Sequence, residues 1–272
     1  MKLAGKVVLL TGASGGIGEA LAKALANQGA SLLLQGRQLA RLEQLRAALP
    51  YPDRHHCLPA DLASARDREQ LGQSQEVTRG IDILINNAGS NVFAWLEDQL
   101  PSQIHEQLVI NVEAPILLTR ALLPRMRKPG LIMNIGSSFG AIGYPGYSVY
   151  CASKFALRGF SEALHRELHG SGIQVLHFAP RATRTRLNSE AAYALNAEIG
   201  TQTDSADFVA AQAVDALIRE TRRRWLGWPE AFFARLNGLF PGLVDRALAK
   251  QHSIIARHAR NSSNVAAHHQ EI

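Results

Sequence analysis

The chain has 272 residues, of which 46 % are hydrophobic and 19 % are charged. This ordinary composition excludes a mostly disordered protein, and a chain of this length buries enough surface to fold without disulfides or metal ions. Lysine and arginine outnumber aspartate and glutamate by 29 to 23, which gives a formal net charge of +6. This excess favours anionic partners such as phosphorylated cofactors, nucleic acid or acidic lipid.

The location of the protein is predicted from its cysteines and its apolar runs. Cys57 and Cys151 are too few for a disulfide framework and are typical of a cytoplasmic protein with reduced thiols. The first apolar run, residues 7–10, is too short for a secretory signal, and no run of apolar residues is long enough to span a bilayer. We therefore expect a cytoplasmic protein that could at most lie on a membrane surface.

Short apolar runs alternate with amphipathic stretches through most of the chain. The apolar runs predict strands at residues 7–10, 31–35, 56–59, 81–85, 131–135 and 174–178. The amphipathic stretches predict helices at residues 18–27, 40–48, 66–78, 102–126 and 148–169. Continuously apolar strands are typical of a parallel sheet that is buried on both faces. The alternation predicts an α/β fold, a Rossmann-type doubly wound parallel sheet with helices on both faces and a ligand at the carboxyl edge of its strands.

A glycine-rich loop joins the first expected strand to the first expected helix. It reads Thr11-Gly12-Ala13-Ser14-Gly15-Gly16-Ile17-Gly18. Glycines let the backbone turn tightly and approach a pyrophosphate, and the helix start offers free N–H groups and the positive end of its dipole. We therefore expect Gly12, Ser14, Gly15, Gly16, Ile17 and Gly18 to bind a dinucleotide.

The end of the second expected strand indicates which dinucleotide is bound. At this position an acidic residue would accept hydrogen bonds from the ribose 2′-hydroxyl of NAD, but the strand ends in Gln35-Gly36-Arg37. The Arg37 guanidinium can instead pair with a 2′-phosphate, and Arg41 lies one helical turn later. We therefore expect NADP(H) to be favoured over NAD(H). A solvated arginine at a helix start is the alternative interpretation of Arg37.

Two more segments follow strands and are expected at the cofactor. Asp61 and Leu62 follow the third strand, where a carboxylate could accept the adenine amino group, although Asp61 could equally cap the next helix. The fourth strand closes with Asn86-Asn87-Ala88-Gly89. Its small residues and amides suit a backbone that passes the cofactor ribose, so Asn87, Ala88 and Gly89 are included in the site, although the tetrapeptide alone could be a turn.

The reacting group is expected on the helix at residues 148–169. Tyr150 and Lys154 are four residues apart and therefore share one helix face. A nearby cation lowers the pKa of a phenol, which would let Tyr150 move a proton near neutral pH, as hydride chemistry at a carbonyl requires. Ser137 follows the fifth strand and could donate to a substrate oxygen. Asn111 lies inside an expected helix, where asparagine is unfavourable, and a contact with Lys154 through water would explain it.

In this order along the chain, these motifs resemble the short-chain dehydrogenase/reductase family. The resemblance rests on Thr11-Gly12-x-x-x-Gly16-Ile17-Gly18, Asn86-Asn87-Ala88-Gly89, Asn111, Ser137 and Tyr150-x-x-x-Lys154, and runs from about residue 6 to residue 185. It implies that Tyr150 is the acid/base and that Ser137 polarises the carbonyl. It also implies that Lys154 binds the nicotinamide ribose and lowers the tyrosine pKa, that Asn111 holds a water leading to solvent, and that NAD(P) supplies the hydride.

The segment after the sixth strand departs from the family pattern. It reads Ala179-Pro180-Arg181-Ala182-Thr183-Arg184-Thr185, and the family usually has glycine after this proline. Arg181 could place a positive charge near an acidic substrate group, or it could point to the surface. Pro180, Thr183 and Thr185 remain expected contacts of the cofactor carboxamide and phosphates. The resemblance also implies a homodimer or homotetramer, built by two helices with long apolar faces.

The end of the chain is expected to form a separate extension. A seventh strand at residues 224–227 would close a dinucleotide-binding catalytic domain of residues 1–228, and residues 229–272 would form a helical extension with a frayed tail. Three interpretations of this extension stay open: core packing or a subunit contact, a lid over a long apolar substrate, and an interfacial helix pair on anionic lipid. The charge around the apolar positions of this extension is mostly basic.

Other patterns carry no site. His165 and His169 share a helix face but have no third ligand in a convincing pattern, so we expect no metal. No nucleic-acid motif accompanies Arg222-Arg223-Arg224, so we expect no nucleic-acid partner. The sequence therefore predicts an NADP-dependent oxidoreductase that interconverts a ketone or aldehyde and an alcohol, with a substrate that could be lipid-like. A non-catalytic NAD(P) sensor and a membrane-surface scaffold are the alternatives.

Overall fold

A parallel sheet of seven strands forms the centre of the computed structural model, which describes the backbone of residues 1–268 and the side chains of residues 1–228 and 230–260. The strands are β1 (Val7–Leu10), β2 (Ser31–Gly36), β3 (His56–Pro59), β4 (Ile81–Asn86), β5 (Met126–Ile135), β6 (Ile173–Ala179) and β9 (Arg223–Trp225). Their order is β3-β2-β1-β4-β5-β6-β9, and every neighbouring pair is parallel. The predicted doubly wound sheet is confirmed, and its seventh strand begins one residue earlier than expected.

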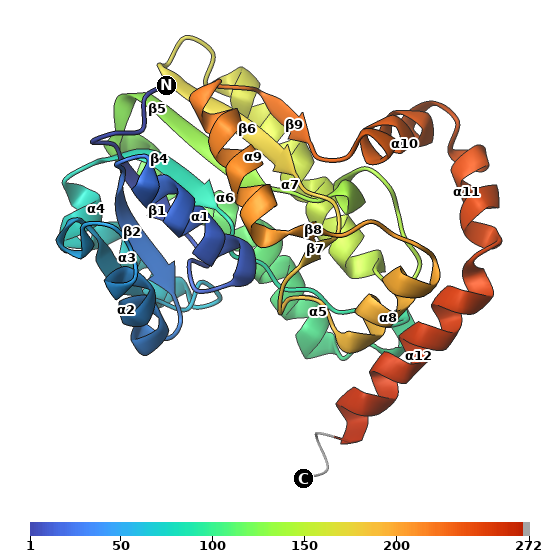
Figure 1. The fold of residues 1–272 in the computed structure, drawn as a ribbon. Helices are drawn as coiled ribbons and strands as arrows, with labels where there is room; N and C mark the ends of the chain where they lie inside the picture. The colour runs from blue at the N-terminus through green and yellow to red at the C-terminus, as the bar shows by residue number, and fades with distance from the viewer. Residues whose placement is uncertain (269–272) are drawn as a thin grey trace.

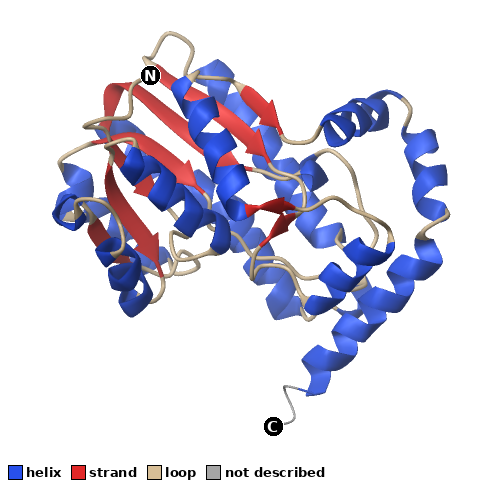
Figure 2. Cartoon of the chain, in the orientation of Figure 1, coloured by secondary structure: helices blue, strands red, loops and turns tan. Residues whose placement is uncertain are grey.

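Helices cover both faces of this sheet (Figures 1 and 2). One face carries α1 (Gly16–Asn27), α2 (Leu39–Ala47) and α9 (Ala206–Ile218), and the other carries α3 (Ala65–Gln73), α4 (Gln75–Thr78), α6 (Ala114–Leu122) and α7 (Ser148–Glu167). Side chains alternate between the faces along each strand. Leu10 is therefore buried in one core cluster and Leu9 in the other.

The helix expected at residues 102–126 is not continuous. It consists of α5 (Pro101–Leu108), a π-helical segment at Val109–Glu113, α6, and a 3₁₀ turn at Leu123–Arg125. The segment contains Asn111, and π-helical turns are rare features that occur often at functional sites. The expected helix at residues 66–78 is also divided, at Ser74, whose hydroxyl donates to the Leu71 carbonyl at 2.8 Å.

The sheet positions a ligand site at the boundary between β1 and β4. From β1 the strand order runs outwards through β2 and β3 on one side and through β4, β5 and β6 on the other. Crossover connections therefore leave the sheet in opposite directions at this boundary, and a crevice opens at the carboxyl ends of the strands. Beyond β6, a two-stranded parallel ladder pairs β7 (Thr183–Arg184) with β8 (Asp204–Ser205).

Three helices follow β9: α10 (Trp228–Leu239), α11 (Pro241–Ala249) and α12 (His252–His268). Pro229 and Pro241 lie in the first turns of α10 and α11, where the missing N–H group costs nothing. α12 packs on α8 (Glu190–Glu198), where Ile255 and Ala259 are buried with Leu195. Residues 259–268, expected to fray, continue α12, and residues 269–272 lie outside the described residues.

Candidate active site

A cavity of about 700 Å³ lies at the carboxyl edge of the sheet. It brings together every residue that the sequence predicted for catalysis or cofactor binding, with the exception of Asn111. It also extends to α10 and α11, where Phe233, Leu236, Val244 and Leu248 line it. The C-terminal extension is therefore part of the cavity wall, a role that helical periodicity alone could not assign.

The glycine loop can hold a pyrophosphate because side chains are excluded from it. Gly12 has a φ of +63°, and a Cβ atom there would lie 2.8 Å from Ala88 Cα. A Cβ atom on Gly18 would overlap the Gly12 carbonyl oxygen, and one on Gly16 would lie 2.7 Å from the Thr185 side chain. No side chain caps the start of α1, so its first N–H groups are left for an anion. These residues fit a dinucleotide.

Hydrogen bonds fix this loop to the neighbouring strands. The Thr11 hydroxyl accepts from the N–H groups of Asn87 at 2.9 Å and Ala88 at 3.0 Å, and Asn87 Nδ2 donates to the Thr11 carbonyl at 2.9 Å. The buried Gln35 side chain accepts from Gly12 N–H at 3.1 Å and donates to the Ala60 carbonyl at 2.8 Å. Sequence reasoning did not assign this role to Gln35, although a lone amide in an apolar strand was the available signal.

Two cations line the end of the cavity that the sequence predicted for the adenosine. Arg37 and Arg41 are exposed, and neither forms an ion pair with a residue in the described part of the chain. Asp61 and Leu62 also line the cavity. Asp61 Oδ1 accepts from Ala63 N–H at 2.9 Å, whereas the N-cap of α3 is Ser64. The alternative in which Asp61 caps the helix is therefore wrong.

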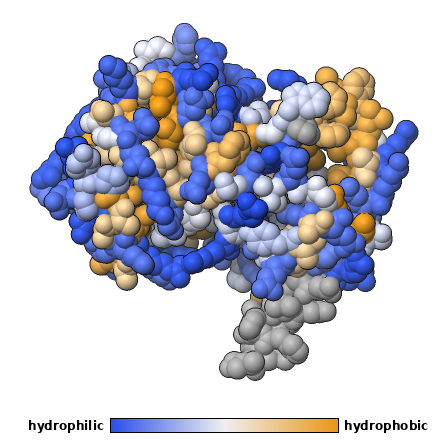
Figure 3. All heavy atoms as spheres, in the orientation of Figure 1, coloured by the Kyte–Doolittle hydropathy of each residue, from blue (hydrophilic) through white to orange (hydrophobic). Residues whose placement is uncertain are grey.

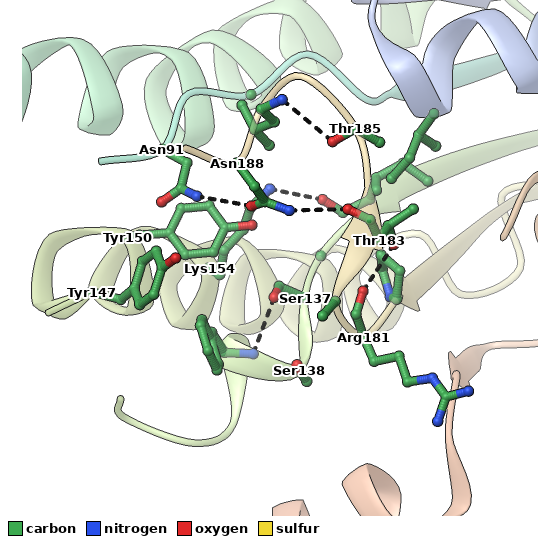
Figure 4. A pocket seen from close by; sticks show the side chains of 18 of the residues that line it. Asn91, Ser137, Ser138, Tyr147, Tyr150, Lys154, Arg181, Thr183, Thr185 and Asn188 are labelled. Atoms are coloured by element: carbon green, nitrogen blue, oxygen red, sulfur yellow. Dashed lines mark hydrogen bonds between the residues drawn. The ribbon is translucent and has the colours of Figure 1, made fainter. Parts of the chain in front are cut away.

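Tyr150, Lys154 and Ser137 meet at the middle of the cavity (Figure 4). The buried Lys154 side chain donates from Nζ to the Ile135 carbonyl at 3.0 Å, and its Nζ lies 5.6 Å from the centre of the Tyr150 ring. Ser137 follows β5 and accepts from Phe139 N–H at 3.1 Å through its hydroxyl. The arrangement places a phenol, a hydroxyl and an ammonium group around one space.

The electrostatics of this group differ from the expectation. Burial raises the pKa of Tyr150 to about 12, and the neighbouring Ser137 hydroxyl only partly opposes the rise. Burial also lowers the pKa of Lys154 to about 8. The lowered phenol pKa expected from the neighbouring ammonium is not found, because removal of the phenolate from water dominates the shift.

Asn111 lies behind the cavity wall rather than on it. Its side chain is buried, accepts from Ser90 N–H at 2.9 Å, and donates to the Ser90 carbonyl at 2.8 Å and to Ser153 Oγ at 3.0 Å. Ser153 in turn donates to the Tyr150 carbonyl at 2.7 Å. The direct partners of Asn111 are therefore the loop after β4 and the helix α7, and Ser153 is a positioning residue that the sequence did not reveal.

Arg181 turns away from Tyr150 (Figure 4). Its guanidinium forms a two-pronged contact with the Asp204 carboxylate at 2.8 and 2.9 Å and donates to Gln202 at 2.9 Å. Glu230 of α10 lies 3.8 Å away. Neither expectation for Arg181 holds, because Asp204 neutralises its charge and the side chain joins β8 to the C-terminal extension.

The loop after β6 lies beside the glycine loop and forms part of the cavity wall. Pro180, Thr183 and Thr185 line the cavity, and the Tyr193 hydroxyl donates to the Thr185 carbonyl at 2.6 Å while accepting from Thr185 N–H at 2.8 Å. Asn188 donates to the Thr183 carbonyl at 3.0 Å. These backbone contacts fix the position of both threonines beside the glycine loop.

Further polar groups near Tyr150 were not predicted. Asn91, Tyr144 and Tyr147 line the cavity on the same side as the phenol. The Asn91 Oδ1 and Tyr144 Oη atoms are buried and have no hydrogen-bond partner in the described part of the chain. Buried polar atoms of this kind are costly unless a ligand or water satisfies them, so they mark the side where a substrate oxygen could bind.

Comparisons with known proteins identify the family of the chain. The sequence model for short chain dehydrogenase matches residues 6–196. Nodulation protein G of Rhizobium sp. (strain N33) is 39 % identical over 223 residues, which cover 78 % of this chain and 89 % of that protein. Dehydrogenase/reductase SDR family member 7B of Mus musculus is 31 % identical, with coverage of 95 % and 83 %. A short-chain dehydrogenase from Sphingobium yanoikuyae, solved with NADPH, is 30 % identical with a TM-score of 0.73, and the match covers 88 % of this chain and 95 % of that one.

The space around two glycines, one in the glycine loop and one on α7, predicts opposite effects of an alanine substitution. Gly18→Ala should lower the free energy of unfolding by about 1–3 kcal/mol and abolish dinucleotide binding, because its Cβ atom would overlap backbone. Gly159→Ala, in an open position on α7, should raise stability by about 0.5–1 kcal/mol. Urea unfolding and NADPH fluorescence titration measure both. Normal NADPH binding by the Gly18 variant would contradict the hypothesis that the glycine loop binds the dinucleotide.

The buried ammonium predicts a pH-dependent stability difference. Between pH 8 and the usual lysine value near 10.5, the unfolded chain binds more protons at Lys154, so this site's contribution to stability rises with pH. Below pH 8 the fold carries the full cost of burying the charge. The free energy of unfolding of Lys154→Met should therefore exceed that of wild type by roughly 1–3 kcal/mol at pH 7. The difference should be smaller at pH 10. The exposed Lys2→Met is the control, and a pH-independent difference for Lys154→Met would refute a buried charge.

Proposed function

The chain belongs to the short-chain dehydrogenase/reductase family, oxidoreductases of CH–OH and C=O groups, and we propose that it uses NADP(H) to interconvert a ketone or aldehyde and an alcohol, with Tyr150 as acid/base. The proposal is carried by one observation. The cavity is lined by Tyr150, Ser137 and Lys154 and also by the glycine loop, so a dinucleotide and a carbonyl compound could lie side by side.

In the reduction direction, Tyr150 and Ser137 bind the carbonyl oxygen with their hydroxyl groups. When bound, the nicotinamide supplies the hydride to the carbonyl carbon. Tyr150 then gives its proton to the oxygen that gains negative charge, and a pKa of about 12 keeps this proton in place at neutral pH until it is needed. Lys154 stabilises the phenolate that remains, because its Nζ lies 5.6 Å from the ring centre.

In this proposal Asn111 acts by holding neighbouring segments in place. It joins the loop after β4 to Ser153, one residue before Lys154, and so fixes the start of α7 relative to the cofactor side of the cavity. We retain the expectation that its amide also holds a water on the route by which protons return to Lys154. Tyr144 and Tyr147 also line the cavity, but Tyr150 is the phenol whose raised pKa is partly opposed by an interaction with the Ser137 hydroxyl.

The preference for NADP(H) is supported by Arg37 and Arg41. Both guanidinium groups line the adenosine end, and no carboxylate follows β2 to accept from a ribose hydroxyl. The Sphingobium enzyme solved with NADPH is consistent with this choice. Asp61, held by its contact with Ala63 N–H, remains available for the adenine amino group.

The substrate is proposed to be apolar over most of its length. The part of the cavity formed by the C-terminal helices and α8 is lined mostly by apolar side chains, although Asn196, Glu230 and Gln251 also line it. The apolar residues are Leu195, Ile199, Phe233, Leu236, Leu243, Val244, Ala247 and Leu248. A pocket of this kind gains binding energy mainly from buried apolar area. A carbonyl compound with a long hydrocarbon portion fits it better than a sugar would.

We also propose that the enzyme is a cytoplasmic homodimer or homotetramer. Three apolar side chains on α5, α6 and α7 are substantially exposed in a single chain: Leu108, Leu117 and Phe155. A two-fold contact between copies would cover them. Two free cysteines, Cys57 and Cys151, suit a reducing compartment.

Removal of the phenol hydroxyl tests the acid/base assignment. Tyr150→Phe should lower kcat/KM for ketone reduction by about 10²–10⁴-fold, because the proton donor is lost, while NADPH binding stays within about twofold. Tyr51→Phe, at an exposed tyrosine outside the cavity, is the matched control. NADPH oxidation across a panel of ketones and aldehydes measures the rates. If wild type and Tyr150→Phe are equally inactive on every compound, the hypothesis of an enzyme is rejected in favour of a non-catalytic dinucleotide sensor.

Removal of the guanidinium at the adenosine end tests the cofactor choice. Arg37→Ala should weaken NADPH binding about 10–150-fold and NADH binding little, since a charge-assisted pair with the 2′-phosphate is worth roughly 1.5–3 kcal/mol. Arg66→Ala, an exposed arginine of α3 that does not line the cavity, is the control. Equal weakening of both dinucleotides by Arg37→Ala would reject the phosphate contact.

A further inference from the structure

The outer face of α10 is apolar and exposed. Trp228, Phe232 and Leu239 recur at helical spacing and are 79 %, 48 % and 73 % exposed, and Phe240, directly after the helix, is 59 % exposed. The Trp228 and Phe232 rings are stacked with their centres 5.8 Å apart. Figure 3 shows apolar residues gathered over α10 and α11 at the surface. We call Trp228, Phe232, Leu239 and Phe240 the outer patch.

The inner face of the same helix is already used. Phe233 and Leu236 line the cavity, Asn237 donates to the Ala141 carbonyl at 2.9 Å, and Glu230 lies 3.8 Å from the Arg181 guanidinium. α10 is therefore held to the body of the protein by its inner face and cannot rotate to bury the outer patch. An exposed patch of four large apolar side chains indicates a surface that contacts another molecule.

The charges near the outer patch favour an anionic lipid surface as the occupant. Arg235 lies between Phe232 and Leu239 in the sequence of α10, and Arg246 and Lys250 follow at the end of α11. Asp245 of α11 is exposed beside them, so the charge of this group remains net positive. None of the three cations forms an ion pair with a residue in the described part of the chain. A second copy docked on this patch by a two-fold axis would bring unpaired cations together, which is costly. Lipid phosphates instead pair with long basic side chains that extend from an apolar face.

The cavity reaches the surface beside this patch. Phe233 and Leu243 both line the cavity and are 45 % and 52 % exposed. A surface that carries apolar compounds would therefore meet the apolar end of the cavity directly. No helix among the described residues is long and apolar enough to cross a bilayer, so the contact would be peripheral.

We propose that the outer patch docks the protein on anionic lipid, with Arg235, Arg246 and Lys250 at the headgroups and the cavity mouth between Phe233 and Leu243 turned towards the membrane. The proposal deepens the proposed function, because it names the place from which an apolar carbonyl compound would enter. Its test needs no turnover, so lipid binding and catalysis can fail separately.

The experiment is co-sedimentation of the full chain with vesicles of phosphatidylcholine alone or mixed with phosphatidylglycerol. Wild type should bind the anionic vesicles, with a blue shift of tryptophan fluorescence that Trp228→Phe reduces. Phe232→Ser/Leu239→Ser should weaken binding at least about tenfold. The control Phe208→Ser/Leu96→Ser removes residues that are 47 % and 58 % exposed elsewhere on the molecule and should bind as wild type does.

The charged part of the proposal has its own variant. Arg235→Glu/Arg246→Glu/Lys250→Glu should lose binding to anionic vesicles, with circular dichroism and thermal melting as checks that each variant is folded. The proposal is overturned if wild type binds neither vesicle, or if Phe232→Ser/Leu239→Ser binds as well as its control. If that variant instead forms a smaller oligomer by light scattering while wild type ignores lipid, the outer patch is a contact between copies.

Discussion

One buried cation organises the site. The Lys154 ammonium is removed from water, donates to the Ile135 carbonyl at 3.0 Å, and lies beneath the Tyr150 ring. Burial of a charge is unfavourable, and the lowered pKa of Lys154 expresses that cost. In the proposed mechanism this cation stabilises the phenolate that Tyr150 leaves behind, because catalysis depends on stabilising charge as it develops.

Much of the surrounding structure keeps α7 in the place that this cation requires. On one side, Asn111 and Ser153 connect the second turn of α7 to the loop after β4. On the other, Asn134 of β5 donates to Ser161 of α7 at 2.8 Å and accepts from Asn86 of β4 at 2.8 Å. These buried amides and hydroxyls form a chain of hydrogen bonds from the sheet to the helix. Within the described residues, the Asn86 Oδ1 atom is buried without a partner, so the chain is not fully satisfied at its sheet end. Buried polar networks of this kind specify one packing arrangement rather than adding much stability.

The sequence predicted the parts of the structure that depend on local pattern. The strands appeared as apolar runs, and the cavity-lining residues followed from motifs at strand ends. The π-helical segment around Asn111 could not be predicted, because an apolar stripe continues through such a turn with little change. The pairing of Arg181 with Asp204 depends on the contact between β7 and β8, which no spacing reveals. The raised pKa of Tyr150 depends on burial by residues from many elements, so the tyrosine–lysine spacing alone gave the wrong sign.

The central claim is that Tyr150 is a protonated phenol in the free protein and becomes easier to ionise when positive charge surrounds it. A spectroscopic pH titration of tyrosinate absorbance, with and without NADP⁺, measures this directly. We expect Tyr144 and Tyr150 both to ionise near pH 12 in the free protein, and the Tyr150 component is the one that is missing from the titration of Tyr150→Phe. This component should move to clearly lower pH in the NADP⁺ complex, where the oxidised ring adds a positive charge. An identical titration curve with and without the dinucleotide would contradict the account.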